Sequence, residues 1–185
     1  MENVSTEYIS KAIEEIVDLI YIKDPVDFNP LLELLHKKEI RKCIKEIALC
    51  LGFPVEIDLA FVSPSDKVNK FETSDLVKTD YRGVGSEGII AQVLIPKNIP
   101  PYGSSTLVNF LIKVKVSKNC IEHPKTFISI ISHELSHILL ATYGSNQADN
   151  EVYTDLTPLV LGFSEIVTAG RKIEKTDPAP DVRSP

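Results

Sequence analysis

The chain has 185 residues, a net charge of −6 at neutral pH and a hydrophobic fraction of 43%. These values are typical of a globular protein with a sizeable core, and the negative charge argues against a general affinity for nucleic acid or anionic membranes. No apolar run approaches the length of about 18 residues that a membrane span needs, and the acidic N-terminus lacks the apolar core of a signal peptide. The three cysteines have no CxxC spacing, which predicts free thiols in a reducing, cytoplasmic compartment.

Two helices are predicted in the N-terminal part of the chain. The first covers about residues 5–22, and the second runs from Pro30 to Leu51, where Gly52 ends it. Asp24-Pro25 and Asn29-Pro30 break the chain between them. The residues of the first helix that are expected to face the core recur at helical spacing: Ile9, Ile13, Ile16, Val17 and Ile20.

Three segments have the apolar alternation of strands and are predicted to form a small sheet: residues 54–62, 88–96 and 106–116. The largely polar stretch of residues 63–86 is interpreted as a long loop. Lys113 and Lys115 form the polar face near the end of the third strand. They are expected to protect an exposed edge of the sheet.

A long helix is predicted over residues 124–144. Pro124 suits the first helical position, where its missing N–H costs nothing, and Gly144 can adopt the left-handed conformation that ends a helix. One face of this helix is expected to be apolar, because large side chains recur at three- and four-residue spacing: Phe127, Ile130, Ile131, Leu135, Ile138 and Leu139.

Three ionisable residues interrupt this apolar run, namely His133, Glu134 and His137. Two histidines four residues apart on a helix lie about 40° apart around its axis, so both imidazoles reach one metal ion. Glu134 lies about 100° around the axis from His133, where it can contact a metal-bound water without being a ligand. This is the HExxH pattern of zinc hydrolases, and it is favoured over a core helix whose histidines are held only by hydrogen bonds.

Catalytic zinc usually has three protein ligands and one open position for water, so a third ligand must come from elsewhere in the chain. The metzincin pattern is excluded, because Leu140 and Tyr143 stand where it needs glycine and histidine. Glu151 and Asp155 are four residues apart and share one helix face. One of them can bind the metal while the other accepts the N–H of a ligand histidine, and the spacing leaves both assignments open.

The segment after Asp155 is compatible with helix, but Pro158 interrupts the pattern. Either this proline kinks one helix, or Thr157 caps a new helix that has Pro158 at its first position. Charge and proline dominate residues 171–185, which predicts a disordered tail. Residues 1–170 are expected to form a single domain.

Two motifs taken together resemble the gluzincin metallopeptidases: His133-Glu134-x-x-His137 and Asn150-Glu151-x-x-x-Asp155. The resemblance implies one zinc ion, and its ligands would be His133, His137 and Glu151. It also implies that Glu134 is the general base and that Asp155 orients a ligand histidine. The link of residues 138–150 is shorter than is typical of the family, and this departure leaves Asp155 as an alternative third ligand.

The expected activity is hydrolysis of peptide bonds by a metal-activated water, with Glu134 taking its proton and passing it to the leaving amine. A peptide or protein is the expected substrate, with neither nucleic acid nor membrane as a partner. In gluzincins an edge strand binds extended substrate, which here would be residues 88–96 or 106–116. Four residues are unranked candidates for stabilising the oxyanion: His123, Tyr143, Tyr153 and Tyr102.

The sequence therefore predicts an α+β fold with two N-terminal helices, a small mixed β-sheet, and a zincin-type active-site helix followed by a glutamate-bearing helix. Zinc-dependent peptide hydrolysis is the function that the motifs favour. The alternative is a metal-binding regulatory or partner-binding module with a zincin-like fold and little or no turnover. A hydrolase acting on a non-peptide bond is a third hypothesis.

Overall fold

The computed structural model of the chain describes residues 5–62, 76–78, 81–82, 90–96, 98–117 and 122–171. Its helices are α1 (Thr6–Leu19), α2 (Asn29–His36), α3 (Ile40–Leu51), α4 (Pro124–Thr142), α5 (Glu151–Pro158), the π-helical η2 (Leu159–Phe163) and α6 (Ser164–Arg171). Its strands are β1 (Glu56–Val62), β2 (Leu76–Lys78), β3 (Tyr81–Arg82), β4 (Ile90–Pro96) and β5 (Leu111–Ser117). The predicted α+β class is confirmed.

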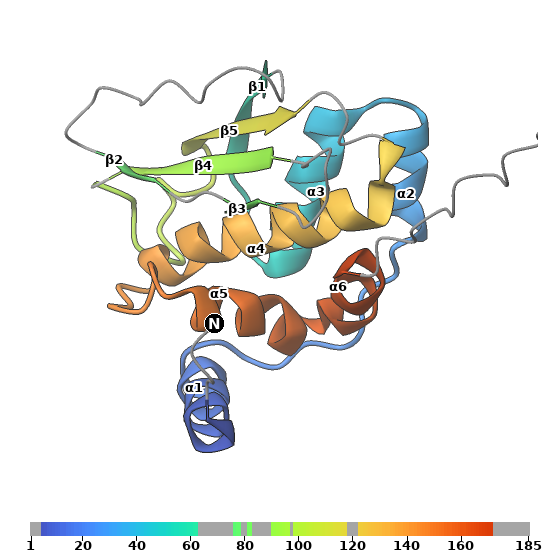
Figure 1. Ribbon diagram of the computed structural model, residues 1–185. Helices are drawn as coiled ribbons and strands as arrows, with labels where there is room; N and C mark the ends of the chain where they lie inside the picture. The colour runs from blue at the N-terminus through green and yellow to red at the C-terminus, as the bar shows by residue number, and fades with distance from the viewer. Residues whose placement is uncertain are drawn as a thin grey trace, which may run out of the picture.

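Helix α4 lies in the middle of the fold, between the sheet and the pair formed by α5 and α6 (Figure 1). Every residue from 127 to 140 is buried. A helix that is covered on all sides is expected to be apolar on all sides, so the prediction of one apolar face was too narrow. Pro124 starts this helix as predicted, and Gly144 follows it with a φ of 69°.

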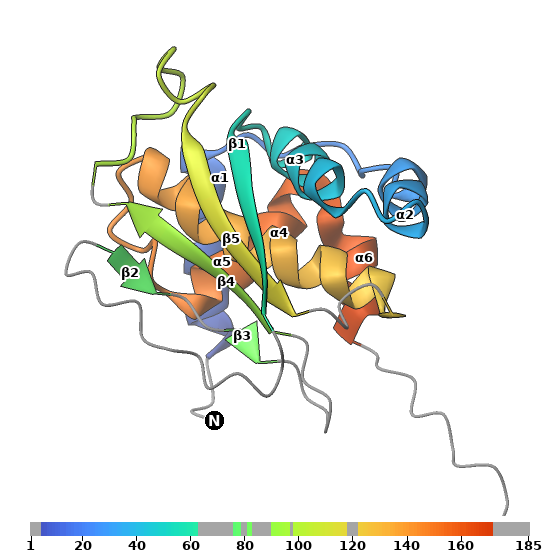
Figure 2. The same ribbon diagram turned by 90° about the horizontal axis from the view of Figure 1, so that it is seen from above.

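The sheet is mixed and has the strand order β1-β5-β4-β2, with β3 also paired to β4. Strand β1 is parallel to β5, and β4 is antiparallel to β5; Figure 2 shows these three strands crossing over α4. Strands β2 and β3 continue one antiparallel register along β4, because Leu76 pairs with Pro96 and Tyr81 pairs with Ala91. The edge of β4 is therefore paired within the chain.

Three predictions about the sheet were wrong. Neither residues 88–96 nor residues 106–116 supply an edge strand for a substrate, because β4 is paired on both sides and β5 is internal. Strand β5 lies between β1 and β4, so Lys113 and Lys115 do not protect an edge. Lys113 is exposed on the face of the sheet that points away from the helices, because its neighbours Ile112 and Val114 are buried. The predicted loop of residues 63–86 contains β2 and β3, and the rest of it lies outside the described residues.

The predicted helix from Pro30 to Leu51 is two helices, α2 and α3. The chain turns at Lys38, which has a φ of 59°. This turn allows both helices to bury their apolar faces, as the full burial of Leu35 and Ile44 illustrates. Helical spacing of apolar residues on both sides of a short break cannot distinguish one helix from two.

Helix α1 packs on the outside of α5, far from the sheet (Figure 1). Ser5 caps it by accepting a hydrogen bond from the backbone N–H of Tyr8, 3.1 Å away. Ile16 and Ile20 are buried as predicted, but Ile13 is 38% exposed. The helix therefore presents a narrow apolar stripe to the body of the protein, which is typical of a helix with one covered side.

The chain continues through Pro158 as helix, so Thr157 does not cap a new one. The Thr157 hydroxyl instead donates to the carbonyl of Tyr153, 2.8 Å away. The interruption lies farther on, at Leu161 and at Gly162, which has a φ of 87°. Residues 20–28 pass over this point, and the Val26 N–H donates to the Gly162 carbonyl at 3.0 Å.

The predicted tail of residues 171–185 lies outside the described residues, apart from Arg171 at the end of α6. Among the helices that the structure describes, none combines the length and the apolar character that a membrane span requires.

Replacement of Gly162 by alanine is expected to lower the free energy of unfolding by about 3 kcal/mol, because strain adds to a backbone clash. An added Cβ would lie 2.2 Å from the carbonyl oxygen of Asp24. Gly103→Ala is the matched control, because Gly103 has a φ of 78° and nothing within 4 Å of its added Cβ. The control should lose only about 1 kcal/mol. Equal losses in urea unfolding would contradict the proposed close approach of residues 20–28.

Candidate metal centre

Helix α4 supplies two histidines from consecutive turns in the centre of the fold. His133 and His137 are 6% and 0% exposed, and their ring centroids are 5.0 Å apart. Burying two imidazoles is unfavourable unless their polar atoms find partners. Since α4 cannot supply such partners from its own backbone, they must come from the segment that packs against it.

That segment is the turn after α4 together with the start of α5. Gly144 ends the helix, and residues 145–150 reverse the chain so that α5 packs against α4. Asn150 caps α5, because its Oδ1 accepts a hydrogen bond from the Val152 N–H at 3.0 Å. Glu151 is therefore the first residue of α5, and Asp155 follows one turn later on the same side.

The carboxylate of Glu151 reaches both imidazoles. Its Oε2 lies 3.2 Å from Nε2 of His133, and its Oε1 lies 3.9 Å from Nε2 of His137. One ligand atom from each of these three residues lies within 4.8 Å of the others. Ligand atoms around tetrahedral zinc are about 3.3 Å apart, so small side-chain adjustments suffice to enclose an ion.

The Nδ1 atoms of both histidines, on the side of each ring away from Glu151, have hydrogen-bond partners of their own. Nδ1 of His133 lies 2.9 Å from Oδ1 of Asp155, and Nδ1 of His137 lies 2.6 Å from the carbonyl oxygen of Ala148. Carboxylate and carbonyl oxygens only accept, so each Nδ1–H donates and each Nε2 is directed toward Glu151. This arrangement favours Glu151 as the third ligand and Asp155 as the residue that orients His133.

His137 provides a direct test of whether a metal ion fits. Its Nε2 is buried and has no hydrogen-bond partner among the residues that the structure describes. Burial lowers the pKa of His137, which keeps the ring neutral with a lone pair on Nε2. A buried acceptor aimed at a carboxylate is poorly satisfied by protein alone, whereas a cation between the two groups satisfies both. These residues therefore fit a metal ion.

His133 responds differently to the same burial. Burial acts to lower the pKa of His133, but the hydrogen bonds to Asp155 and Glu151 outweigh it and raise the pKa to about 9. The hydrogen bond to His133 in turn lowers the pKa of Glu151. In the protein without metal, a proton on His133 therefore offsets part of the charge of the two carboxylates, and a metal ion bound at its Nε2 would displace this proton.

Glu134 is fully buried beside these residues, and its charge also acts to raise the pKa of His133. It is not a member of the group of three that can hold a metal ion. This placement is compatible with a carboxylate that handles protons near the metal without binding it. The assignment of Glu134 as general base stays a prediction.

The four candidates for stabilising the oxyanion are engaged elsewhere or lie far along the chain. The Tyr153 hydroxyl donates to Glu15 of α1, and Tyr143 stacks on Tyr102 with ring centroids 4.2 Å apart. The Tyr102 hydroxyl donates to the carbonyl of Gly52. His123 precedes α4, so it is about 15 Å along the helix axis from His133.

Two contributors to the site were absent from the sequence prediction. The carbonyl of Ala148 orients His137 through the backbone, which has no signature in the sequence. Asn150 caps α5, and asparagine directly before a helical glutamate is a recognisable cap in a sequence. A capping analysis finds the second contributor from sequence, but not the first.

Comparison of the chain with protein-family models, with curated proteins and with solved structures finds no match. The assignment of the site therefore rests on its geometry.

Replacement of His133 by alanine is expected to abolish stoichiometric zinc binding, because only His137 and Glu151 of the three grouped residues remain. Metal analysis of the purified protein after dialysis against zinc measures the effect. His36→Ala is the matched control, since His36 is exposed in the last turn of α2. If the His133 variant retains one equivalent of zinc, the proposed centre is wrong.

Replacement of Asp155 by asparagine should weaken zinc binding by about tenfold, because the ring of His133 loses the charged acceptor on its Nδ1–H. Competition with a chelator measures the dissociation constant. Asp58→Asn provides the control, because Asp58 is an exposed carboxylate on β1. If both variants bind zinc like the wild type, Asp155 has no orienting role.

Proposed function

We propose that this protein is a zinc-dependent metallopeptidase. The observation that carries the proposal is the convergence of both histidine Nε2 atoms on the Glu151 carboxylate while both Nδ1 atoms are anchored from behind. A buried carboxylate, Glu134, lies beside this group. Structural histidines need partners, but their Nε2 atoms do not need a common target, so a metal centre explains the arrangement best.

The residues of the chain would divide the chemistry between them. His133, His137 and Glu151 would hold the zinc ion, which when bound lowers the pKa of a water to about 7 and polarises a carbonyl group. Glu134 would accept a proton from the attacking water and pass it to the leaving amine. Asp155 and the Ala148 carbonyl would keep the two imidazoles in the tautomer that leaves Nε2 free.

Access to the site is uneven, which bears on the substrate. The side chains of His133 and His137 are buried, whereas that of Glu151 is 69% exposed. A substrate would therefore approach from the side of Glu151 at the start of α5. We infer that it is a peptide or an unfolded segment of a protein, because an extended chain can reach a centre that is open on one side only.

A metal-binding module without turnover is the second candidate. It is favoured by the positions of Tyr102, Tyr143 and Tyr153, whose contacts lie away from the ligands. Stabilising an oxyanion normally takes a donor in addition to the metal. A protein that binds zinc but lacks such a donor would serve as a regulatory or partner-binding module.

The proposal includes a cytoplasmic location. It rests on the cysteines, because Cys50 carries a free thiol and thiols persist in reducing compartments.

Replacement of Glu134 by glutamine should preserve zinc binding and lower the rate of peptide hydrolysis at least about a hundredfold, because glutamine cannot accept the proton. Zinc content and cleavage of a mixed peptide library are measured on the same samples. Glu165→Gln is the matched control, since Glu165 is exposed on α6. Hydrolysis by the zinc-loaded Glu134 variant at the wild-type rate would refute the assignment. A wild type that binds zinc and cleaves nothing would favour the module.

A further inference from the structure

The turn between α4 and α5 determines the positions of two parts of the metal centre. Ala148 orients His137 through its carbonyl, and Glu151 begins immediately after the turn. A shift of this turn would move Glu151 and would also release the ring of His137. The features that hold the turn in place therefore control how well the centre is preformed.

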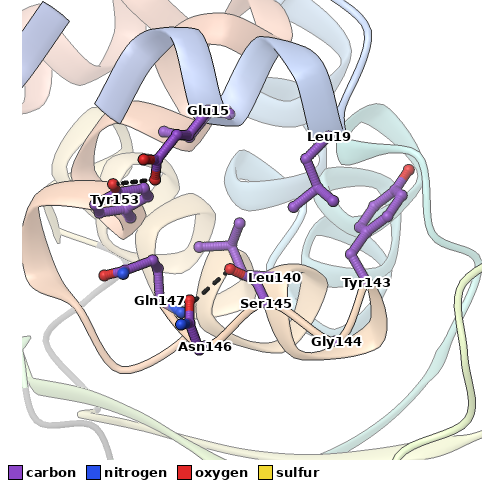
Figure 3. A pocket seen from close by; sticks show the side chains of 10 residues that line it. Glu15, Leu19, Leu140, Tyr143, Gly144, Ser145, Asn146, Gln147 and Tyr153 are labelled. Carbon is purple, nitrogen blue, oxygen red and sulfur yellow. Dashed lines mark hydrogen bonds between the residues drawn. The ribbon is translucent and has the colours of Figure 1, made fainter. Parts of the chain in front are cut away.

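Ala148 packs against the hydrophobic core, but the side of the turn that faces α1 is open. A cavity of about 380 Å³ separates it from α1, with Glu15 and Leu19 of α1 on one side and Ser145 and Gln147 of the turn on the other (Figure 3). Side chains that line an open pocket have few packing neighbours on that side. On the side that faces α1, the turn is held by specific hydrogen bonds.

Asn150 makes three of these hydrogen bonds. Its Oδ1 caps α5, and its Nδ2 donates to Oε1 of Gln147 and to the hydroxyl of Tyr8, both at 2.9 Å. Both amide hydrogens and one carbonyl lone pair are thus used. The amide group of Asn150 therefore connects Gln147 of the turn, the first turn of α5 and, through Tyr8, helix α1.

Tyr8 is the contribution of α1 to this network. Its ring also packs edge-on against Tyr153 of α5, with centroids 6.4 Å apart and an interplanar angle of 77°. Glu15, two turns farther along α1, accepts a hydrogen bond from the Tyr153 hydroxyl. Helix α1 therefore contacts α5 through Tyr8 and through Glu15, and of these two residues Tyr8 is the one bonded to Asn150.

We propose that Tyr8 is a positioning residue of the metal centre, acting through Asn150 on the turn that orients His137 and presents Glu151. This inference rests on the proposed zinc centre and goes beyond it, since it assigns α1 a role in metal affinity. Loss of the Tyr8 hydroxyl leaves Asn150 with its cap and its bond to Gln147. Loss of the Asn150 amide removes both the bond to Tyr8 of α1 and the bond to Gln147 within the turn.

The test measures the zinc dissociation constant of the full chain by competition with a chelator, below the temperature at which any variant unfolds. Tyr8→Phe removes the hydroxyl and keeps the ring, and it should weaken binding about threefold, the effect of one exposed hydrogen bond. Asn150→Ser keeps a capping oxygen and loses both donated bonds, so it should weaken binding about tenfold. Tyr21→Phe is the control for the first change, because Tyr21 is 92% exposed.

The double variant distinguishes positioning from a general effect on stability. If Tyr8 acts through Asn150, Tyr8→Phe should cause no further loss of zinc affinity when Asn150 is already serine. A threefold loss that persists in the double variant overturns the proposal, as does equal affinity of the Tyr8 and Tyr21 variants. A wild type that binds no zinc overturns both this inference and the metal centre. Wild-type binding combined with equal tyrosine variants overturns the inference alone.

Discussion

The burial of α4 on all sides is the constraint on which the rest of the structure depends. This helix lies between the sheet and the α5–α6 pair, and yet it carries His133, Glu134 and His137 at its centre. Ionisable groups in such a place are strongly unfavourable unless other segments provide partners for them. The partners of the two histidines come from a single short stretch, residues 148–155, which supplies a backbone carbonyl and two carboxylates. The buried histidines of α4 therefore require α5 to pack close against α4.

The close return of α5 has consequences farther away. A helix that packs its polar side against α4 must be held by contacts on its other sides, and α1 and residues 20–28 provide them. Helix α1 contacts α5 through Tyr8 and Glu15, and the backbone N–H of Val26 donates to the carbonyl of Gly162 within η2. The crossing requires glycine at position 162, because an added Cβ there would meet the Asp24 carbonyl. The N-terminal segments, remote in sequence, thus complete the support of the site.

The parts of this arrangement that could be predicted are those with local causes. Pro124 and Gly144 mark the ends of α4, and the spacing of His133, His137, Glu151 and Asp155 follows from helix geometry, so each could be read from the sequence. The errors have non-local causes. The position of β5 inside the sheet depends on its pairing with both β1 and β4, which the alternation of one strand does not encode. The break at Lys38 leaves helical spacing intact on both sides. The Ala148 carbonyl has no side-chain signature, because any residue carries one.

The centre is built unevenly, and the unevenness indicates how it would work. The two histidines are fixed by burial and by hydrogen bonds at Nδ1, so little conformational entropy remains for them to lose when an ion binds. Glu151 is largely exposed. Apart from its contact with His133, it is held by its place at the first position of a capped helix, where its negative charge is also favoured by the helix dipole. Binding of an ion would therefore order one carboxylate and displace one proton, while the rest of the centre is already in place. Affinity in such a centre depends most on its least constrained ligand, and that ligand depends on the turn before it.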